Sequence, residues 1–202
     1  MLVWEAFGAG SVWPLAGSIT AARGPAAAAQ ARWPPGSQIP VRIETANAPR
    51  GADGLVERAL RAWTDAADGR LRLHRSGAAD AAIRVRFIRP GAVYGETVPH
   101  ADPRTGVLVG AEVAVTAPVE GDALERQIIL YLTALHELGH ALGLIHSDEF
   151  TDIMYRFRRA DDGERYFGAY RARLSSDQDI GSPKATGLSA RDVDALRALY
   201  DR

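Results

Sequence analysis

The stretch HELGHALGLIH, from His136 to His146, is the most informative part of this chain. Its apolar residues recur at helical spacing, and His136 and His140 are four residues apart, so both imidazoles project from one face of the helix. Glu137 lies beside them, where a carboxylate can take the proton of a metal-bound water. This spacing predicts a zinc site on a helix.

Gly143 supplies the second half of the motif. A residue that can adopt a positive φ angle ends a helix and turns the chain sharply, so we expect His146 to swing back as a third ligand. Three protein nitrogens leave the fourth tetrahedral position open, as in catalytic zinc sites. The alternative is an ordinary amphipathic helix with three incidental histidines. Unpartnered polar groups on so apolar a helix are costly, which favours the zinc site.

Outward from this motif, the chain alternates between strand and helix patterns. Period-two alternation predicts strands at 39–45, 82–88 and 107–116, and 91–106 is predicted to be a glycine-punctuated loop. Helical spacing predicts a helix carrying Leu55 to Trp63, with Trp63 in the core, and further helices beginning near Asp122 and Ser189. Strands followed by helices indicate an α+β fold or a small mixed sheet with helices.

Composition excludes several classes of protein. The 202 residues carry a net charge of −1, which argues against nucleic-acid binding, and they include no cysteine. Disulfides, a thiol nucleophile and cysteine-ligated metals are therefore excluded. No run is long and apolar enough for a membrane span.

The first 31 residues differ from the rest. They are rich in alanine and glycine, and residues 29–31 (AQA) have the small-x-small pattern of a signal-peptidase site, yet the basic n-region is missing. A signal or pro-segment remnant and a disordered leader both remain open. We therefore expect a leader at 1–31 and a single catalytic domain at 32–202.

At the histidine motif the chain resembles the metzincin metallopeptidases, whose signature H-E-x-x-H-x-x-G-x-x-H is followed by a methionine turn. Met154, in DIMY, is similar to that Met-turn, a hydrophobic floor under the zinc. Ser147, the opening RWPPGSQIPVRI (32–43) and the ending LSARDVDALRALY (188–200) resemble the matrixin branch. The resemblance covers about residues 32–202.

This resemblance implies a twisted five-stranded mixed sheet, an active-site helix, a second packing helix and a small C-terminal subdomain that ends in a helix. It implies a zinc endopeptidase that cleaves internal peptide bonds of proteins, with a zinc-activated water and Glu137 as general base. It also implies an edge strand that binds the substrate backbone. The stretch that corresponds to this strand is Gly106, Val107, Leu108, Val109, Gly110, Ala111 and Glu112. The alternative is that this stretch is a core strand that does not contact the substrate.

The resemblance leaves some features open. One catalytic zinc is expected, whereas His100 and Asp102 are too few for a second, closed zinc site. Calcium is common in the family, and the candidate oxygen donors Asp102, Glu120 and Asp122 do not define a coordination set. His74 and His100 are expected to be solvated, and Tyr155 to be structural. Without a cysteine, the thiolate latency of the family is ruled out.

The stretch from Arg156 to Arg173 combines arginines with aromatic residues. Its charge and glycine content favour a solvated, flexible loop over a segment that shapes the substrate pocket. The chain is expected to act as a secreted monomer on protein or peptide substrates, with no nucleic acid and no membrane span. The alternative function is a non-catalytic zinc-containing binding module on the same scaffold, and the presence of Glu137 argues against it.

Overall fold

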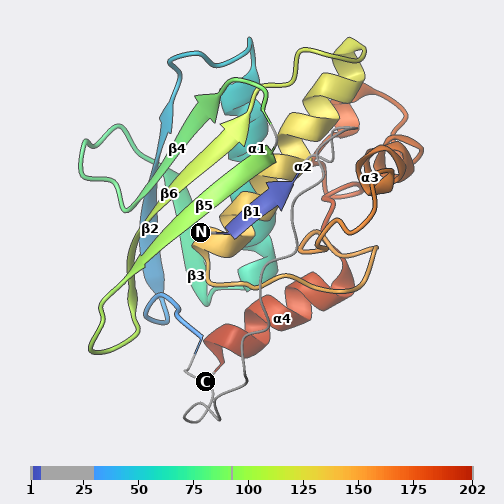
Figure 1. Ribbon diagram of the computed structural model, residues 1–202. Helices are drawn as coiled ribbons and strands as arrows, with labels where there is room; N and C mark the ends of the chain where they lie inside the picture. The colour runs from blue at the N-terminus through green and yellow to red at the C-terminus, as the bar shows by residue number, and fades with distance from the viewer. Residues whose placement is uncertain (1, 6–29, 92, 202) are drawn as a thin grey trace, which may run out of the picture.

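The strands of the chain assemble into one twisted mixed sheet (Figure 1). The computed structural model describes residues 2–5, 30–91 and 93–201. The strands are β1 (Leu2–Glu5), β2 (Ser37–Glu44), β3 (Leu71–Arg75), β4 (Ile83–Ile88), β5 (Val93–Ala101) and β6 (Leu108–Thr116). Their order across the sheet is β1-β5-β6-β4-β2-β3.

The five strands β2 to β6 confirm the predicted mixed sheet. The four strands β3, β2, β4 and β6 are parallel to one another, and β5 is antiparallel to β6. Buried and more exposed residues alternate along β2 and β4, which is the pattern of a sheet with one face against a core. β1 adds a sixth strand, antiparallel to β5.

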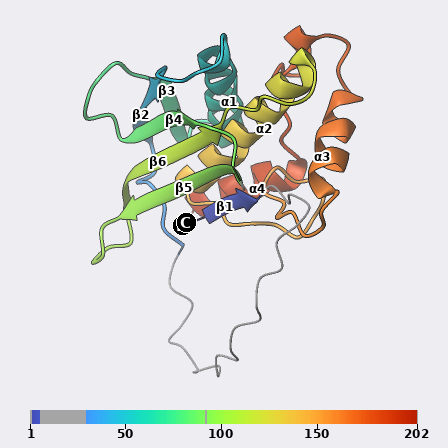
Figure 2. The ribbon, with the colours of Figure 1, turned by 45° about the horizontal axis from the view of Figure 1, so that its top comes forward.

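Two long helices cover one face of this sheet (Figure 2). α1 (Ala52–Ala67) packs against β3, and α2 (Ala123–Ala141) packs against β5, β6 and α1. Trp63 is fully buried in this layer, as expected, and its indole nitrogen donates to the Leu135 carbonyl oxygen at 2.8 Å. Burying an aromatic side chain of this size contributes about 3 kcal/mol.

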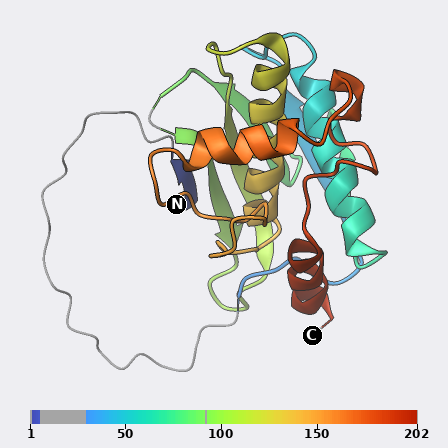
Figure 3. The same cartoon turned by 90° about the vertical axis from the view of Figure 1, so that its right-hand side faces the viewer.

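The rest of the chain lies beside and below these layers (Figure 3). α3 (Asp162–Arg171) packs against α2, and α4 (Ala190–Tyr200) contacts α1. A short 3₁₀ helix, Asp177–Asp179, lies between them in sequence. The predicted final helix is confirmed, and Ser189 caps it by accepting from the Asp192 amide at 3.0 Å.

Two segments differ from the sequence-based prediction. Most of the segment 91–106, predicted to be a loop, is strand β5, whose backbone pairs with β6. The prediction was wrong because Gly95 and Pro99 give this segment the composition of a loop. The predicted flexible loop at 156–173 contains α3, whose Tyr166, Phe167 and Tyr170 are buried. In both cases tertiary packing outweighs local composition.

The predicted leader is only partly described. Residues 2–5 form β1, and residues 30 and 31 precede the bridge between Arg32 and Val107. Met1 and residues 6–29 lie outside the described residues. The predicted division of the chain at residues 31 and 32 therefore stays a prediction.

Candidate metal centre

Three histidine side chains converge at the end of α2. His136 and His140 are fully buried on this helix, and His146 reaches them from the following loop. The His146 Nε2 atom lies 3.3 Å from the His136 Nε2 and 3.2 Å from the His140 Nε2. Gly143 makes this approach possible, because its φ of +94° turns the chain where the helix ends.

Backbone carbonyl groups orient the two buried rings. The His136 Nδ1 donates to the Ile153 oxygen at 2.6 Å, and the His140 Nδ1 donates to the Leu144 oxygen at 2.8 Å. Each ring therefore carries its hydrogen on Nδ1 and offers the lone pair of Nε2 to the shared centre. In metal-binding proteins, histidine ligands are commonly oriented in this way, by a hydrogen bond from the ring nitrogen that does not bind the metal.

The spacing of these atoms fits a tetrahedral metal ion. Two nitrogens bonded to zinc at 2.0–2.1 Å across a tetrahedral angle lie about 3.3 Å apart. Burial lowers the pKa of His140 and of His146 to about 4, and that of His136 well below its usual value. The rings are thus neutral near pH 7, and a neutral imidazole can offer a ring nitrogen lone pair to a cation.

Glu137 lies on the side of α2 that faces β5. Its Oε2 accepts from the Thr97 hydroxyl at 2.7 Å, and its Oε1 is buried with no hydrogen-bond partner among the described residues. Gly95 of β5 packs against this side chain. A β-carbon at position 95 would lie 2.6 Å from the Glu137 Cγ, so only glycine fits here without a shift. Burial raises the pKa of Glu137 to about 8, although the Thr97 hydrogen bond opposes this shift.

Met154 lies beneath the helix that carries the histidines. It is 3% exposed, and a β-carbon on Gly139 would overlap its sulfur. The Met154 carbonyl oxygen accepts from the Ser147 amide at 2.7 Å, which ties the turn to the chain just after His146. The predicted floor residue therefore packs directly against α2.

Two buried carboxylates hold this turn in place. Asp192 of α4 accepts from the amides of Ile153 and Ser189, each at 2.8 Å. Asp152 accepts from the hydroxyls of Ser147 at 2.6 Å and Ser189 at 2.7 Å. The prediction did not include these residues; the only sequence signal was the helix-capping pattern of Ser189 and Asp192.

The predicted substrate strand has a different position from the expected one. Leu108–Glu112 belongs to β6, which pairs with β5 on one side and, from Ala111 onward, with β4 on the other. Gly106 and Val107 precede β6, and Val107 bridges to Arg32. The expected edge position is therefore wrong, because β5, predicted as a loop, and β1 lie outside β6 on that side of the sheet.

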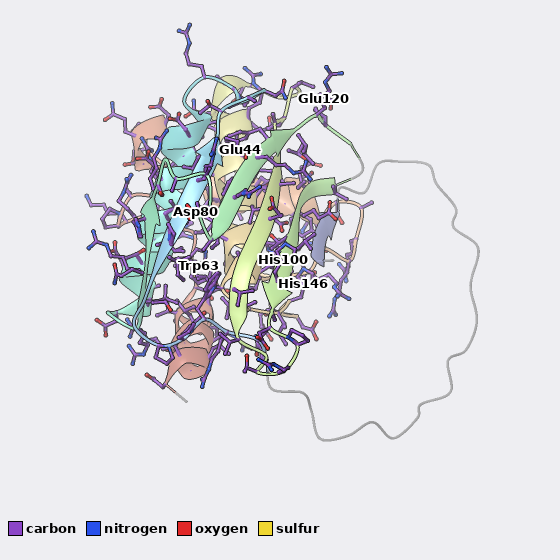
Figure 4. All side chains as sticks on the ribbon, turned by 90° about the vertical axis from the view of Figure 1, so that its left-hand side faces the viewer. Glu44, Trp63, Asp80, His100, Glu120 and His146 are labelled. Carbon is purple, nitrogen blue, oxygen red and sulfur yellow. The ribbon has the colours of Figure 1, made fainter. Side chains whose placement is uncertain are left out.

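The candidate calcium ligands do not come together. Asp102 lies in the turn between β5 and β6, where its Oδ1 accepts from the Arg104 amide at 2.8 Å. Glu120 precedes α2 at the opposite end of the sheet (Figure 4), and Asp122 caps α2 by accepting from the Glu125 amide at 2.9 Å. Over the described residues, the three histidines are the only group of three or more side chains placed to bind a metal.

The remaining histidines and Tyr155 agree with their expected surroundings. His74 and His100 are exposed on β3 and β5. The Tyr155 hydroxyl donates to the buried Asp162 carboxylate at 3.0 Å, which is a structural contact. No helix within the described residues is long and apolar enough to cross a membrane.

Comparison with known proteins agrees with this architecture. Residues 38–167 match the family model of the matrixin peptidases, Peptidase_M10. Macrophage metalloelastase of Rattus norvegicus is 33% identical over 158 residues, 73% of this chain and 28% of that protein. Stromelysin-1 of Mus musculus is 29% identical over 178 residues, 81% of this chain and 32% of that protein.

A human relative is similar over a shorter stretch. Matrix metalloproteinase-20 of Homo sapiens is 34% identical over 116 residues, 51% of this chain and 22% of that protein. In each of these three comparisons the aligned region is less than a third of the relative's own length. The match to the family model covers more than half of this chain, and together with the histidine geometry it shows that the chain belongs to the matrixin family.

Proposed function

We propose that this protein is a zinc endopeptidase that hydrolyses internal peptide bonds of protein substrates. The observation that carries the proposal is the position of Glu137, which follows His136 on α2 next to the three converging imidazoles. It is a buried carboxylate, and one of its oxygens has no hydrogen-bond partner among the described residues. His136, His140 and His146 would hold the zinc. When bound there, zinc supplies Lewis acidity and makes a water molecule more acidic.

The chain's own groups then have distinct tasks. Oε1 of Glu137 is available to take a proton and to return it to the leaving amine, as a general base and acid. The Thr97 hydroxyl holds the other oxygen of that carboxylate, so the group has a fixed orientation. Met154 and the carbonyl groups of Ile153 and Leu144 keep the imidazoles in position.

We propose that the substrate backbone pairs with the outer edge of β5, not with β6. β1 already pairs with this edge in the antiparallel direction, with Trp4 opposite Gly95 and Glu5 opposite Val93. Gly95 is also the residue that contacts Glu137, so a chain paired here passes beside the candidate base. A substrate that uses this edge must displace β1.

Glu137→Gln tests the chemistry. The variant should retain one zinc per chain, and its cleavage of denatured casein should fall about a thousandfold, because a positioned proton-transfer group contributes factors of this size. Glu149→Gln, an exposed glutamate near His146, is the matched control and should cleave normally. Zinc-loaded wild-type protein that cleaves no denatured substrate would favour the alternative, a zinc-containing binding module.

Deletion of residues 1–5 tests the proposed edge. Removing β1 should lower KM for peptide substrates with little change in kcat, because the backbone groups of β5 are freed before the substrate arrives. A substitution in β6 such as Leu108→Lys is not an equivalent test of substrate binding, because Leu108 is buried in the core. An unchanged KM after the deletion would contradict the assignment of the substrate to β5.

Export and the monomeric state remain predictions. We propose that the protein acts outside the cytoplasm, since an uninhibited endopeptidase would damage cytoplasmic proteins. Sequencing the N-terminus of the mature protein tests this: a start near Arg32 supports export and processing, and a start at Met1 contradicts both. Light scattering of the purified protein tests the monomer.

A further inference from the structure

His146 differs from the other two histidines in what its second ring nitrogen meets. The Nδ1 atoms of His136 and His140 donate to carbonyl oxygens. The His146 Nδ1 instead lies 3.3 Å from Nε of the Arg156 guanidinium, which is a donor. In this arrangement the His146 Nδ1 must accept, so its hydrogen is on Nε2.

Binding a metal changes this contact. A neutral imidazole that gives its Nε2 lone pair to a metal carries its hydrogen on Nδ1. Nδ1–H of His146 and the Nε–H of Arg156 then face each other as two donors without an acceptor. A carboxylate accepts hydrogen bonds at both oxygens, so one carboxylate can satisfy the two groups together.

Arg156 also lacks the carboxylate partners of its neighbours. Arg158 pairs with Asp148, and Arg165 lies 3.6 Å from Asp162. Across the described part of the chain, no carboxylate oxygen lies within 4.0 Å of the Arg156 guanidinium. An exposed, permanently charged group next to a metal ligand is therefore available to an incoming anion.

The backbone fixes Arg156 at this place. Its amide donates to the Ser147 carbonyl oxygen at 3.2 Å, and the preceding residue, Tyr155, forms a parallel bridge with Ser147. Arg156 is thus held on the segment that directly follows the buried Met154. Its position relative to the zinc ligands does not depend on a long, unsupported loop.

We propose that Arg156 and the Nδ1–H of His146 together bind a carboxylate of the substrate, so that the enzyme favours peptides with Asp or Glu next to the scissile bond. This inference rests on the proposed peptidase function and adds a substrate class to it. The same chemistry would also accept the C-terminal carboxylate of a short peptide, and the experiment below separates these two sources.

Binding to the zinc-loaded Glu137→Gln variant gives a readout that does not need catalysis. The probes are three peptides of one sequence: a central Glu with an amidated C-terminus, a central Gln with an amidated C-terminus, and a central Gln with a free C-terminus. Titration calorimetry should show about tenfold tighter binding of the Glu peptide than of the amidated Gln peptide, as expected for charge-assisted hydrogen bonds at a partly exposed site.

Substitutions at Arg156 identify the group responsible. In the Glu137→Gln background, Arg156→Gln should bring the ratio of the two dissociation constants close to one, and Arg156→Lys should retain part of it. Arg159→Gln is the matched control, because Arg159 is also exposed and has no carboxylate within ion-pair distance in the described structure. Removing zinc should reduce the ratio, since the His146 Nδ1 then accepts from Arg156 again.

Each outcome has a defined meaning. A ratio that Arg156→Gln leaves unchanged overturns the proposal, and so does tighter binding of only the peptide with the free C-terminus, which would assign the site to chain ends. A library of peptides cleaved by the wild-type protein should show Asp or Glu enriched at one position beside the cut. Absence of cleavage with the Glu preference intact in binding would refute the peptidase function and leave the carboxylate site standing.

Discussion

The two parts of the candidate metal centre are held by different forces. His136 and His140 belong to α2, a helix of 19 residues buried against the sheet by apolar side chains. His146 and Met154 belong to the chain after α2, which has no strand of its own and is held by buried carboxylates that bind backbone amides and hydroxyls. The first part is a helix packed by the hydrophobic effect, and the second is a loop fixed by hydrogen bonds.

This difference has a consequence for stability. Apolar packing is spread over many contacts, so single changes in α2 have graded effects. Hydrogen bonds to one buried carboxylate are concentrated, and removal of that group leaves several buried donors unsatisfied at once. The loop half of the centre should therefore be the more sensitive to single polar substitutions.

Asp192→Ala should have the largest effect. It leaves the buried amide of Ile153 and the partly buried amide of Ser189 without an acceptor, so the free energy of unfolding should fall on the order of 3 kcal/mol. Urea denaturation measures this change. Asp194→Ala, on an exposed face of the same helix, should stay within about 0.5 kcal/mol of the wild type. A loss below 1 kcal/mol for Asp192→Ala would remove the contrast between the two halves.

Gly143→Ala tests the junction between the halves. A φ of +94° is unfavourable for alanine, and a β-carbon here would overlap the Ala31 carbonyl oxygen, so stability should fall by about 2 kcal/mol. Gly168→Ala is the control of opposite sign: it lies in α3 with open space around it, and it should gain about 0.5 kcal/mol. Thermal unfolding compares them, and equal effects would contradict this view of the turn.

Gly139→Ala and Met154→Ala test the packing that joins the halves. Each change alone should destabilise, the first by crowding and the second by leaving a cavity. Because the added methyl group fills space that the methionine vacates, the double variant should be about 1.5 kcal/mol more stable than the sum of the two effects predicts. Additive effects in a double-mutant cycle would show that Met154 does not pack on Gly139.

Tyr155→Phe should have the smallest effect. It removes one hydrogen bond to Asp162, whose Oδ2 still accepts from the Arg158 amide at 2.8 Å, so the loss should be about 1 kcal/mol. Because Tyr155 is a structural residue, kcat/KM should remain at the wild-type value. A large loss of kcat with normal stability would instead place the Tyr155 hydroxyl among the groups that act on the substrate.

The sequence predicted the first half of the centre more completely than the second. His136, Glu137 and His140 could be located because the geometry of a helix relates residues four apart without reference to the rest of the chain. The turn at Gly143 could be located because few residues adopt a positive φ. Asp152 could not, because its partner Ser189 is distant in sequence and is brought to it only by the packing of α4.

The errors in the fold have the same origin. β5 has the glycine and proline of a loop, and only its pairing with β6 identifies it as a strand. The arginines of α3 suggested a solvated loop, but Tyr94 of β5 packs edge-to-face on Phe167 with ring centroids 5.1 Å apart. Such contacts join residues far apart in sequence, so the local pattern of apolar and polar residues does not predict them.

By itself, the sequence predicted the cluster of three histidines, the candidate base beside them and the α+β class, because these follow from helical spacing and from periodic burial. Only the tertiary structure decided that β5 lies beside Glu137, that Asp152 and Asp192 fix the turn at Met154, and that Arg156 contacts His146. Each of these depends on contacts between backbone and side-chain groups of different segments, and the packing of the whole chain brings those segments together.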